Sequence, residues 1–297
     1  MNAQEWLAMN SSSPHVALIG APISRASISP SEAWSTPPAF RAALHRFPLW
    51  DAAHEIDISR LQIQDLGDIE DDRNDASASA AHDRIWRAVS HIRFDPVVVV
   101  VGGDNSLTRP ALEGLMAARN ETWGLLTLDA HHDVRPTTNG SSNGSPVREL
   151  IEAGLPGKRV AQVGIHPFGN QQELAAWAQE QGIHRFGIPE VRQRGAAAAV
   201  RLALERLSDA GAEHVYADLD VDVVDRAYAP ACPASMPGGL NPDDFCSAAF
   251  ELGCDSRVMA VDLCEVDANK DVNGITVRLM AQAFMSFCAG LTYRLSA

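Results

Sequence analysis

Two short acidic segments contain the residue types that could do chemistry. The first, LLTLDAHHDVRP (125–136), ends an apolar run with four potential metal ligands: Asp129, His131, His132 and Asp133. The second, HVYADLDVDVVD (214–225), places carboxylates at alternate positions: Asp218, Asp220 and Asp222. Closely spaced carboxylates repel one another and raise each other's pKa unless a cation neutralises them. The two segments therefore predict a metal site.

The donor types indicate which metal and which chemistry to expect. Carboxylate oxygens with imidazole suit Mn²⁺ or a similar divalent ion better than zinc in a thiolate site. Bridging carboxylates would allow two ions close together, and such a pair yields hydroxide from a shared water molecule at neutral pH. Taken singly, an Asp-x-His sequence is also compatible with a capping or turn role, and the alternate aspartates with a solvated edge strand. Together, beside an otherwise apolar strand, so many uncompensated acids would be costly.

Eight apolar, β-rich runs would position these residues. They lie at 16–20, 63–69, 97–103, 123–130, 159–165, 184–188, 214–221 and 257–266. Helical patterns separate most of them, among these 77–93, 110–120, 170–182, 190–207 and 273–290. This alternation predicts an α/β fold, with a mostly parallel eight-stranded sheet and helices on both faces.

The acidic residues fall where such a sheet binds ligands, which is beyond the carboxyl ends of its strands. Asp129 and Asp133 follow the fourth run, the alternate aspartates end the seventh, and Glu265 follows the eighth. Loops are short except near 21–36 and 225–242, and there is no linker or internal repeat. The sequence therefore predicts a single domain over residues 1–297.

Composition narrows the class of protein. The 297 residues are 46% hydrophobic and 21% charged, as in an ordinary soluble globular chain. The formal net charge of -14 is spread along the sequence without a basic run, which argues against nucleic acid or an anionic membrane as partner. The N-terminal segment lacks the order of a signal peptide, so the cytoplasm is the expected location. Five cysteines without a C-x-x-C pair indicate reduced thiols.

Four segments in order resemble the motifs of the ureohydrolases, the family of arginases, agmatinases and formimidoylglutamases. They are GGDNS (102–106), DAHHD (129–133), DLDVDVVDRAYAPACPASMPGGL (218–240) and DLCEV (262–266). The resemblance spans nearly the whole chain. It implies a single-domain, three-layer arginase-like fold with a binuclear Mn²⁺ site. It also implies hydrolysis of a C–N bond in a guanidino or formimidoyl group of a small-molecule amidine, and a homo-oligomer, commonly a trimer or hexamer.

The resemblance also implies roles for individual residues. The positions that match metal ligands are Asp129, His131, Asp133, Asp220 and Asp222. Glu265 matches the carboxylate that orients the substrate amidine, as a carboxylate pairs with the N–H donors of a guanidinium. Glu265, Asp133 and His166 are thus the candidates for catalytic roles, whereas His132 is expected to point away from the metals.

The sequence departs from the family pattern at two positions. Asn105 stands where the family ordinarily has a metal-binding histidine, and an amide oxygen is a weaker donor than imidazole for Mn²⁺. One of the two metal sites is therefore in doubt, and His166 could supply the missing imidazole. Asn143 stands where arginases have a proton-shuttling histidine, and it cannot titrate.

The loop motifs resemble formimidoylglutamases most. Arg135 and Arg148, with Asn143 and Glu265, are the candidate substrate-binding residues, because two arginines could clamp the two carboxylates of N-formimidoyl-L-glutamate. Each arginine could equally form a surface ion pair. The sequence thus predicts hydrolysis of this compound to glutamate and formamide, in histidine degradation. An agmatinase or guanidino-acid hydrolase that releases urea, and a metal-depleted binding homologue without catalysis, are the alternatives.

Overall fold

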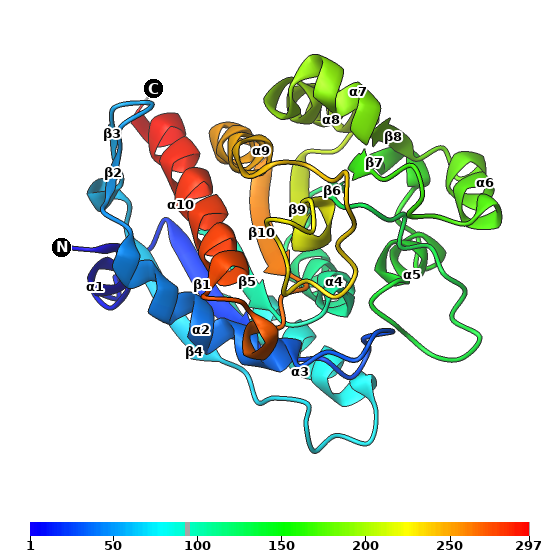
Figure 1. Ribbon diagram of the computed structural model, residues 1–297, viewed down its shortest axis with the longest axis horizontal. Helices are drawn as coiled ribbons and strands as arrows, with labels where there is room; N and C mark the ends of the chain where they lie inside the picture. Colours follow the sequence, from blue (N-terminus) through cyan, green and yellow to red (C-terminus); the bar gives the residue numbers. More distant parts are fainter. Residues whose placement is uncertain (93–95, 297) are drawn as a thin grey trace.

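Eight parallel strands form one sheet through the middle of the molecule (Figure 1). The computed structural model describes residues 1–92 and 96–296. In the order of the sheet the strands are β4 (Ile63–Asp68), β1 (Val16–Ala21), β5 (Val97–Gly102), β10 (Val258–Cys264), β9 (His214–Asp220), β6 (Trp123–Leu128), β7 (Val160–Ile165) and β8 (His184–Gly187). All eight coincide with predicted runs, so the α/β prediction is confirmed.

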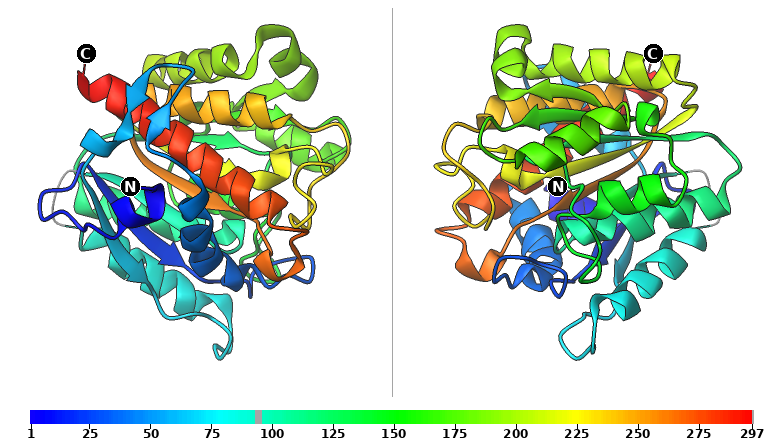
Figure 2. Two further views of the ribbon diagram at one scale, coloured as in Figure 1. Left: turned by 60° about the vertical axis from the view of Figure 1, so that its left-hand side comes forward. Right: turned by 90° about the vertical axis from the view of Figure 1, so that its right-hand side faces the viewer.

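Helices cover both faces of this sheet and complete three layers (Figure 2). One face packs against α1 (Ala3–Leu7), α2 (Thr36–Ala43), α7 (Ile188–Arg194), α8 (Ala196–Asp209), α9 (Pro242–Cys254) and α10 (Ile275–Ser296). The other face packs against α3 (Ala78–Ser90), α4 (Thr108–Ala118), α5 (Pro146–Glu152) and α6 (Gln172–Glu180). In β5, Val99 faces the first layer and Val100 the second, which explains why a central strand is apolar at every position.

Two predicted helices differ from the observed ones, and one pair of short strands was not predicted. The pattern at 190–207 is divided between α7 and α8 at Gly195, whose φ of 84° interrupts helical geometry. The helix predicted at 77–93 ends at Ser90, and Arg93 lies outside the described residues. A small antiparallel hairpin of β2 (Trp50–Asp51) and β3 (Ile56–Asp57) was not predicted, because strands this short carry no periodic signal.

The longest helix is part of the core. Among the described residues α10 alone, with 22 residues, is long and apolar enough by length and composition to cross a membrane. However, 78% of its apolar segment is buried inside the molecule. It packs against α9 and α2, so its apolar surface is accounted for by helix packing.

Four neighbouring strands bring the acidic segments together. β5, β10, β9 and β6 are adjacent and parallel, so the chain leaves all four at the same edge of the sheet. The loop after β1 approaches this edge closely, and Gly103 makes the approach possible. A Cβ added at Gly103 would lie only 2.0 Å from the carbonyl oxygen of Ile23. The sheet order therefore creates the candidate site.

Candidate metal and substrate site

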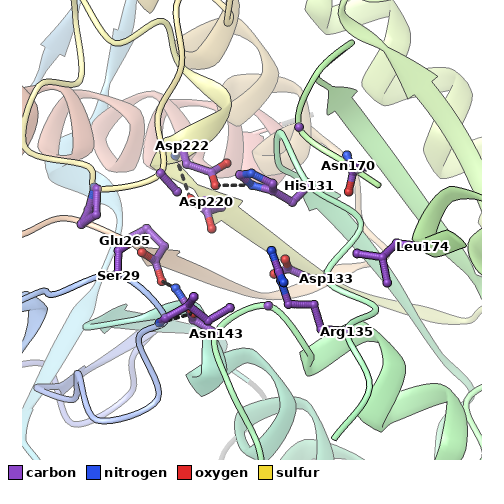
Figure 3. Close-up of a pocket in the computed structure, with 15 residues that line it drawn as sticks. Ser29, His131, Asp133, Arg135, Asn143, Asn170, Leu174, Asp220, Asp222 and Glu265 are labelled. Carbon is purple, nitrogen blue, oxygen red and sulfur yellow. Dashed lines mark hydrogen bonds and ion pairs between the residues drawn. The ribbon is translucent and has the colours of Figure 1, made fainter. Parts of the chain in front are cut away.

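A pocket of about 200 Å³ opens at the carboxyl edge of the four central strands (Figure 3). Seven of the residues singled out in the sequence line it: His131, Asp133, Arg135, Asn143, Asp220, Asp222 and Glu265. Two more, Asp129 and Asn105, are buried and contact these lining residues. The sequence thus identified most of the polar pocket wall.

Two groups of side chains could each hold a metal ion. Asp129, His131 and Asp222 offer ligand atoms within 4.8 Å of one another, and so do Asp129, Asp133 and Asp220. Asp129 belongs to both groups, and its Oδ2 is buried without a hydrogen-bond partner. A carboxylate with one unsatisfied oxygen between two ligand groups has the geometry of a bridging ligand.

The protonation equilibria of this cluster also point to a cation. Burial and then the neighbouring Asp222 raise the pKa of Asp129 to about 7. Burial and then Asp129 raise the pKa of Asp133 well above its usual value, and burial together with Asp222 does the same for Asp220. Without a cation, some of these carboxyls must be neutral at pH 7. A divalent ion would replace those protons.

His131 already supplies one positive charge to the cluster. Its Nδ1 lies 2.6 Å from Asp222 Oδ2, and this carboxylate raises the pKa of His131 to about 12. Burial opposes ionisation of Asp222, but the facing imidazolium outweighs it and lowers the Asp222 pKa. The protonated imidazole thus supplies positive charge to a carboxylate that a bound metal ion would also neutralise.

Two of the acidic residues have an unusual backbone conformation. Asp133 has a φ of 51° and Glu265 a φ of 65°, in the left-handed region that non-glycine residues seldom adopt. Such strain costs about 1–3 kcal/mol and persists where the surroundings determine it. Both residues follow strands whose ends form the pocket, so the strain serves to turn their carboxylates inward.

Glu265 is held by two donors on one oxygen. The backbone N–H of Asn105 donates to Oε1 over 2.7 Å, and the Asn143 amide donates to the same oxygen over 2.9 Å (Figure 3). Both hydrogen bonds described for the Glu265 side chain end on Oε1, which leaves Oε2 for a ligand. Burial and then Asp104 raise the Glu265 pKa to about 8. A cationic amidine in the pocket would favour the ionised form.

The two asparagines connect Glu265 to other parts of the site. Asn143 accepts a hydrogen bond from the backbone N–H of Ile28 over 3.0 Å, so it ties the loop after β1 to Glu265. The side-chain amide of Asn105 donates to Asp133 Oδ2 over 2.6 Å. Asn105 begins a short 3-10 helix (Asn105–Leu107) after β5, which places it between Glu265 and Asp133.

Two predicted residues do not reach the pocket. Arg148 donates to Glu152 Oε1 over 2.7 Å, and its guanidinium carbon lies 4.7 Å from the centre of the Trp177 ring. His166 is engaged at both ring nitrogens, one 3.0 Å from the carbonyl oxygen of Pro237 and the other 3.2 Å from the N–H of Phe168. The structure therefore supports neither a second substrate arginine nor a substitute imidazole ligand.

Asp218 separates from its two neighbours in the acidic segment. Asp220 ends β9 and Asp222 lies in the following 3-10 helix, but Asp218 is one step deeper in the strand. It lies with Asp262 and Cys264 in a buried group beneath the pocket. Of the three alternate aspartates, only Asp220 and Asp222 reach the pocket.

His132, which was expected to point away from the metals, contacts a neighbouring strand, and four residues that the sequence did not single out line the pocket. His132 pairs with Gln162 across the strands, 2.7 Å from Nδ1 to Oε1, and so supports the loop from behind. Ile28, Ser29, Asn170 and Leu174 line the pocket from the loop after β1 and from around α6. The unusual length of the 21–36 loop was the only signal for the first two. Asn170 and Leu174 carried no signal.

Comparisons with known proteins agree with this geometry. A model of the arginase family matches residues 14–290. The formimidoylglutamase of Halalkalibacterium halodurans is 34% identical over 280 residues, which are 92% of this chain and 86% of that protein. The human mitochondrial guanidino acid hydrolase is 31% identical over 237 residues, 77% of this chain and 64% of that protein.

Solved structures agree as well. The crystal structure of formimidoylglutamase from Bacillus subtilis covers 93% of this chain and 87% of its own, with a TM-score of 0.87 and 29% identity. That of Trypanosoma cruzi formiminoglutamase with Mn²⁺ covers 95% and 94%, with a TM-score of 0.86 and 24% identity, and shows the same fold. Because the family model covers most of the chain and the fold matches that of a solved relative, the chain belongs to the arginase family.

Proposed function

We propose that the protein is a manganese-dependent hydrolase that converts N-formimidoyl-L-glutamate and water to L-glutamate and formamide. The observation that carries this proposal is the charge arrangement of the pocket. Its inner wall is acidic, with Glu265 and the aspartates, while Arg135 also lines it. A substrate with a cationic amidine at one end and carboxylate at the other matches both charges.

The donor set fits two divalent ions that share Asp129. His131 and Asp222 would complete one site, and Asp133, Asp220 and Asn105 the other. The unsatisfied Oδ2 of Asp129 and the raised carboxyl pKa values support this assignment. When bound, the ions would supply Lewis acidity and an activated water molecule.

The chain's own residues would bind and orient the amidine. Glu265 Oε2 would accept N–H donors of the amidinium, because Oε1 is already occupied by Asn105 and Asn143. The burial of Glu265, which is 2% exposed, strengthens this ion pair by excluding water. Asp133, turned inward by its backbone, lies on the opposite side of Asn105. Glu265 and Asp133 are the residues to which we assign catalytic roles.

Arg135 would bind a carboxylate of the substrate. No hydrogen bond or ion pair is described for its guanidinium within residues 1–92 and 96–296, whereas Arg148 is paired with Glu152. Agmatine, a dication, would be repelled by this charge. One available arginine matches one carboxylate, so a guanidino acid that releases urea is the second candidate, in line with the human relative's name.

A substrate panel tests these assignments. The purified protein with Mn²⁺ would be incubated with N-formimidoyl-L-glutamate, 4-guanidinobutyrate and agmatine, and formamide, urea and glutamate would be measured. We expect formamide and glutamate in equal amounts from the first compound. Urea from guanidinobutyrate, without formamide, would replace the substrate by a guanidino acid. No turnover together with less than one Mn²⁺ per chain would favour a binding protein that lacks catalysis.

We further propose a cytoplasmic homo-oligomer, a trimer or hexamer, built from one catalytic domain over residues 1–297. Large apolar side chains that the monomer leaves more than half exposed support an assembly: Trp50, Tyr293 and Leu295. Light scattering coupled to gel filtration would give three or six times the 31.9 kDa chain mass. A monomer at micromolar concentration would contradict the proposal.

A further inference from the structure

Beneath the pocket, one hydroxyl group joins Asn105 to a buried carboxylate. Thr108, the first residue of α4, is fully buried, and its Oγ1 lies 2.7 Å from Asn105 Oδ1. The same Oγ1 lies 2.8 Å from Asp262 Oδ2. Thr108 therefore contacts two oxygen atoms at hydrogen-bond distance, although a hydroxyl group has only one hydrogen to donate.

Of the two oxygens, Asp262 Oδ2 is the better acceptor for the Thr108 hydroxyl hydrogen. A buried carboxylate can only accept, and Tyr216 already donates its hydroxyl hydrogen to the same Oδ2 over 2.7 Å. Burial raises the Asp262 pKa to about 6, while the hydroxyl groups of Tyr216 and Thr108 favour its ionised form. A hydrogen bond to a charged oxygen is about twice as strong as one to an amide oxygen. Thr108 then presents a lone pair, rather than a hydrogen, to Asn105.

A lone pair on Thr108 requires a donor on Asn105. In the present orientation the amide oxygen faces Thr108 and the amide nitrogen faces Asp133 Oδ2, 2.6 Å away. Half a turn of the amide would exchange the two atoms, give Thr108 its donor, and bring Oδ1 beside Asp133. Two unprotonated oxygens at that separation repel each other unless a cation lies next to both.

We propose that cation binding beside Asp133 turns the Asn105 amide, and that Thr108 is the positioning residue that holds its oxygen toward the ion. This inference rests on the proposed metal-dependent function. In that state Thr108 accepts a hydrogen bond from Asn105 Nδ2 and donates its own hydrogen bond to Asp262 Oδ2. It does for an asparagine what outer hydrogen-bond partners do for metal-binding histidines, which is to fix the orientation of the donor atom.

Mn²⁺ binding by variants of the full chain tests this role. Thr108→Val replaces the hydroxyl by a methyl group of similar size, and Thr108→Ser keeps the hydroxyl. Titration calorimetry with MnCl₂ should show that Thr108→Val raises the Kd of the weaker of two Mn²⁺ sites about tenfold. Loss of the hydrogen-bond partner of a metal ligand has an effect of this size in other proteins. Thr108→Ser should bind within about twofold of the parent. Thr108→Ala serves the same comparison if the valine variant does not fold.

A double-mutant cycle separates positioning from general support of the fold. Asn105→Leu removes the amide, so adding Thr108→Val to it should cause no further loss of Mn²⁺ affinity. An equal loss in both backgrounds, or parental affinity of Thr108→Val, would overturn the inference while leaving the proposed function intact. Failure of the parent protein to bind any Mn²⁺ would overturn both. Crystals of the parent with Mn²⁺ should show Asn105 Oδ1, held by Thr108, on the ion.

Discussion

Arg135 and Arg148 are the same residue type in neighbouring parts of the chain, but their surroundings differ. Arg135 lines the pocket, whereas Arg148 is held by Glu152 and the Trp177 ring. A guanidinium that already has a carboxylate partner gains little from a second one. We therefore propose that Arg135, rather than Arg148, recognises the substrate by its charge.

Replacing Arg135 should weaken substrate binding more than turnover. In Arg135→Ala we expect KM for N-formimidoyl-L-glutamate to rise roughly 10–100-fold with a small change in kcat, because a charge-assisted hydrogen bond of about 1.5–3 kcal/mol is lost. Arg148→Ala is the matched control, and its KM should stay within about threefold of the parent value. Steady-state kinetics measures both. An equal rise in KM in the two variants would contradict the assignment to Arg135.

Replacing Glu265 should affect turnover without removing metal. Glu265→Gln keeps the size of the side chain but removes the charge that faces the amidine, so kcat/KM should fall about 10²–10³-fold. The metal content, measured by elemental mass spectrometry, should equal that of the parent because Glu265 is outside both ligand groups. Glu173→Gln on the exposed side of α6 is the control. Loss of manganese in Glu265→Gln would show that this carboxylate is a ligand.

At the scale of elements, the site depends on loops that pack against one another. The loop after β1 contacts the turn after β5 at Gly103, and Asn143 ties the same loop to Glu265. Neither contact joins regular strands or helices. Changes far from the pocket wall can therefore move Glu265.

Gly103→Ala tests the close approach of these two loops. The new Cβ would meet the backbone of Ile23 at 2.0 Å, so the loop after β1 must shift. We expect a loss of about 1–3 kcal/mol in the free energy of unfolding, as for overpacked cores, and a reduced kcat/KM. Gly187→Ala, whose Cβ would meet its nearest neighbour at 3.5 Å, is the control and should cost clearly less. Urea unfolding of both variants measures these free energies. A Gly103→Ala variant as stable as the parent would contradict the packing argument.

At the scale of the whole molecule, the buried carboxyls link stability to pH and to metal. In the metal-free chain the pKa of Asp129 is about 7 and that of Glu265 about 8, above their ordinary values of 3.8 and 4.5. At pH values between the ordinary and the raised pKa of each group, the folded state binds more protons than the unfolded state. The free energy of unfolding therefore falls as pH rises. The contribution of these groups is present below about pH 4 and is lost as pH rises through 7 to 8.

Melting of the metal-free protein should follow this linkage. We expect its Tm to be lower at pH 8 than at pH 6 by at least ~3 °C, which corresponds to about 1 kcal/mol for a chain of this size. Mn²⁺ should raise the Tm more at pH 8 than at pH 6, because fewer protons have to be displaced. Calorimetry with and without Mn²⁺ measures both. A stabilisation by Mn²⁺ that is independent of pH would contradict the coupling.

Local features of the sequence were enough to predict the sheet, the edge at which the site forms and the kinds of side chain there. These follow from local properties: apolar periodicity identifies strands such as β5, and the spacing in DAHHD and DLDVD identifies carboxylates and imidazole at strand ends. The resemblance to the arginase family was confirmed by a family model that matches residues 14–290. Strand order then brings Asp129 and Asp220 together without further information from the side chains.

Which polar side chains reach the pocket depends on how the elements pack, so it could be read only from the tertiary structure. Arg148 in α5 and His166 after β7 have their partners outside the pocket, and Asp218 lies one step deeper in β9 than Asp220. The contact between Thr108 and Asp262 joins residues 154 positions apart. A side chain's partner depends on how distant elements pack, and a hydrogen bond a few ångströms long is set by that packing and not by spacing along the chain.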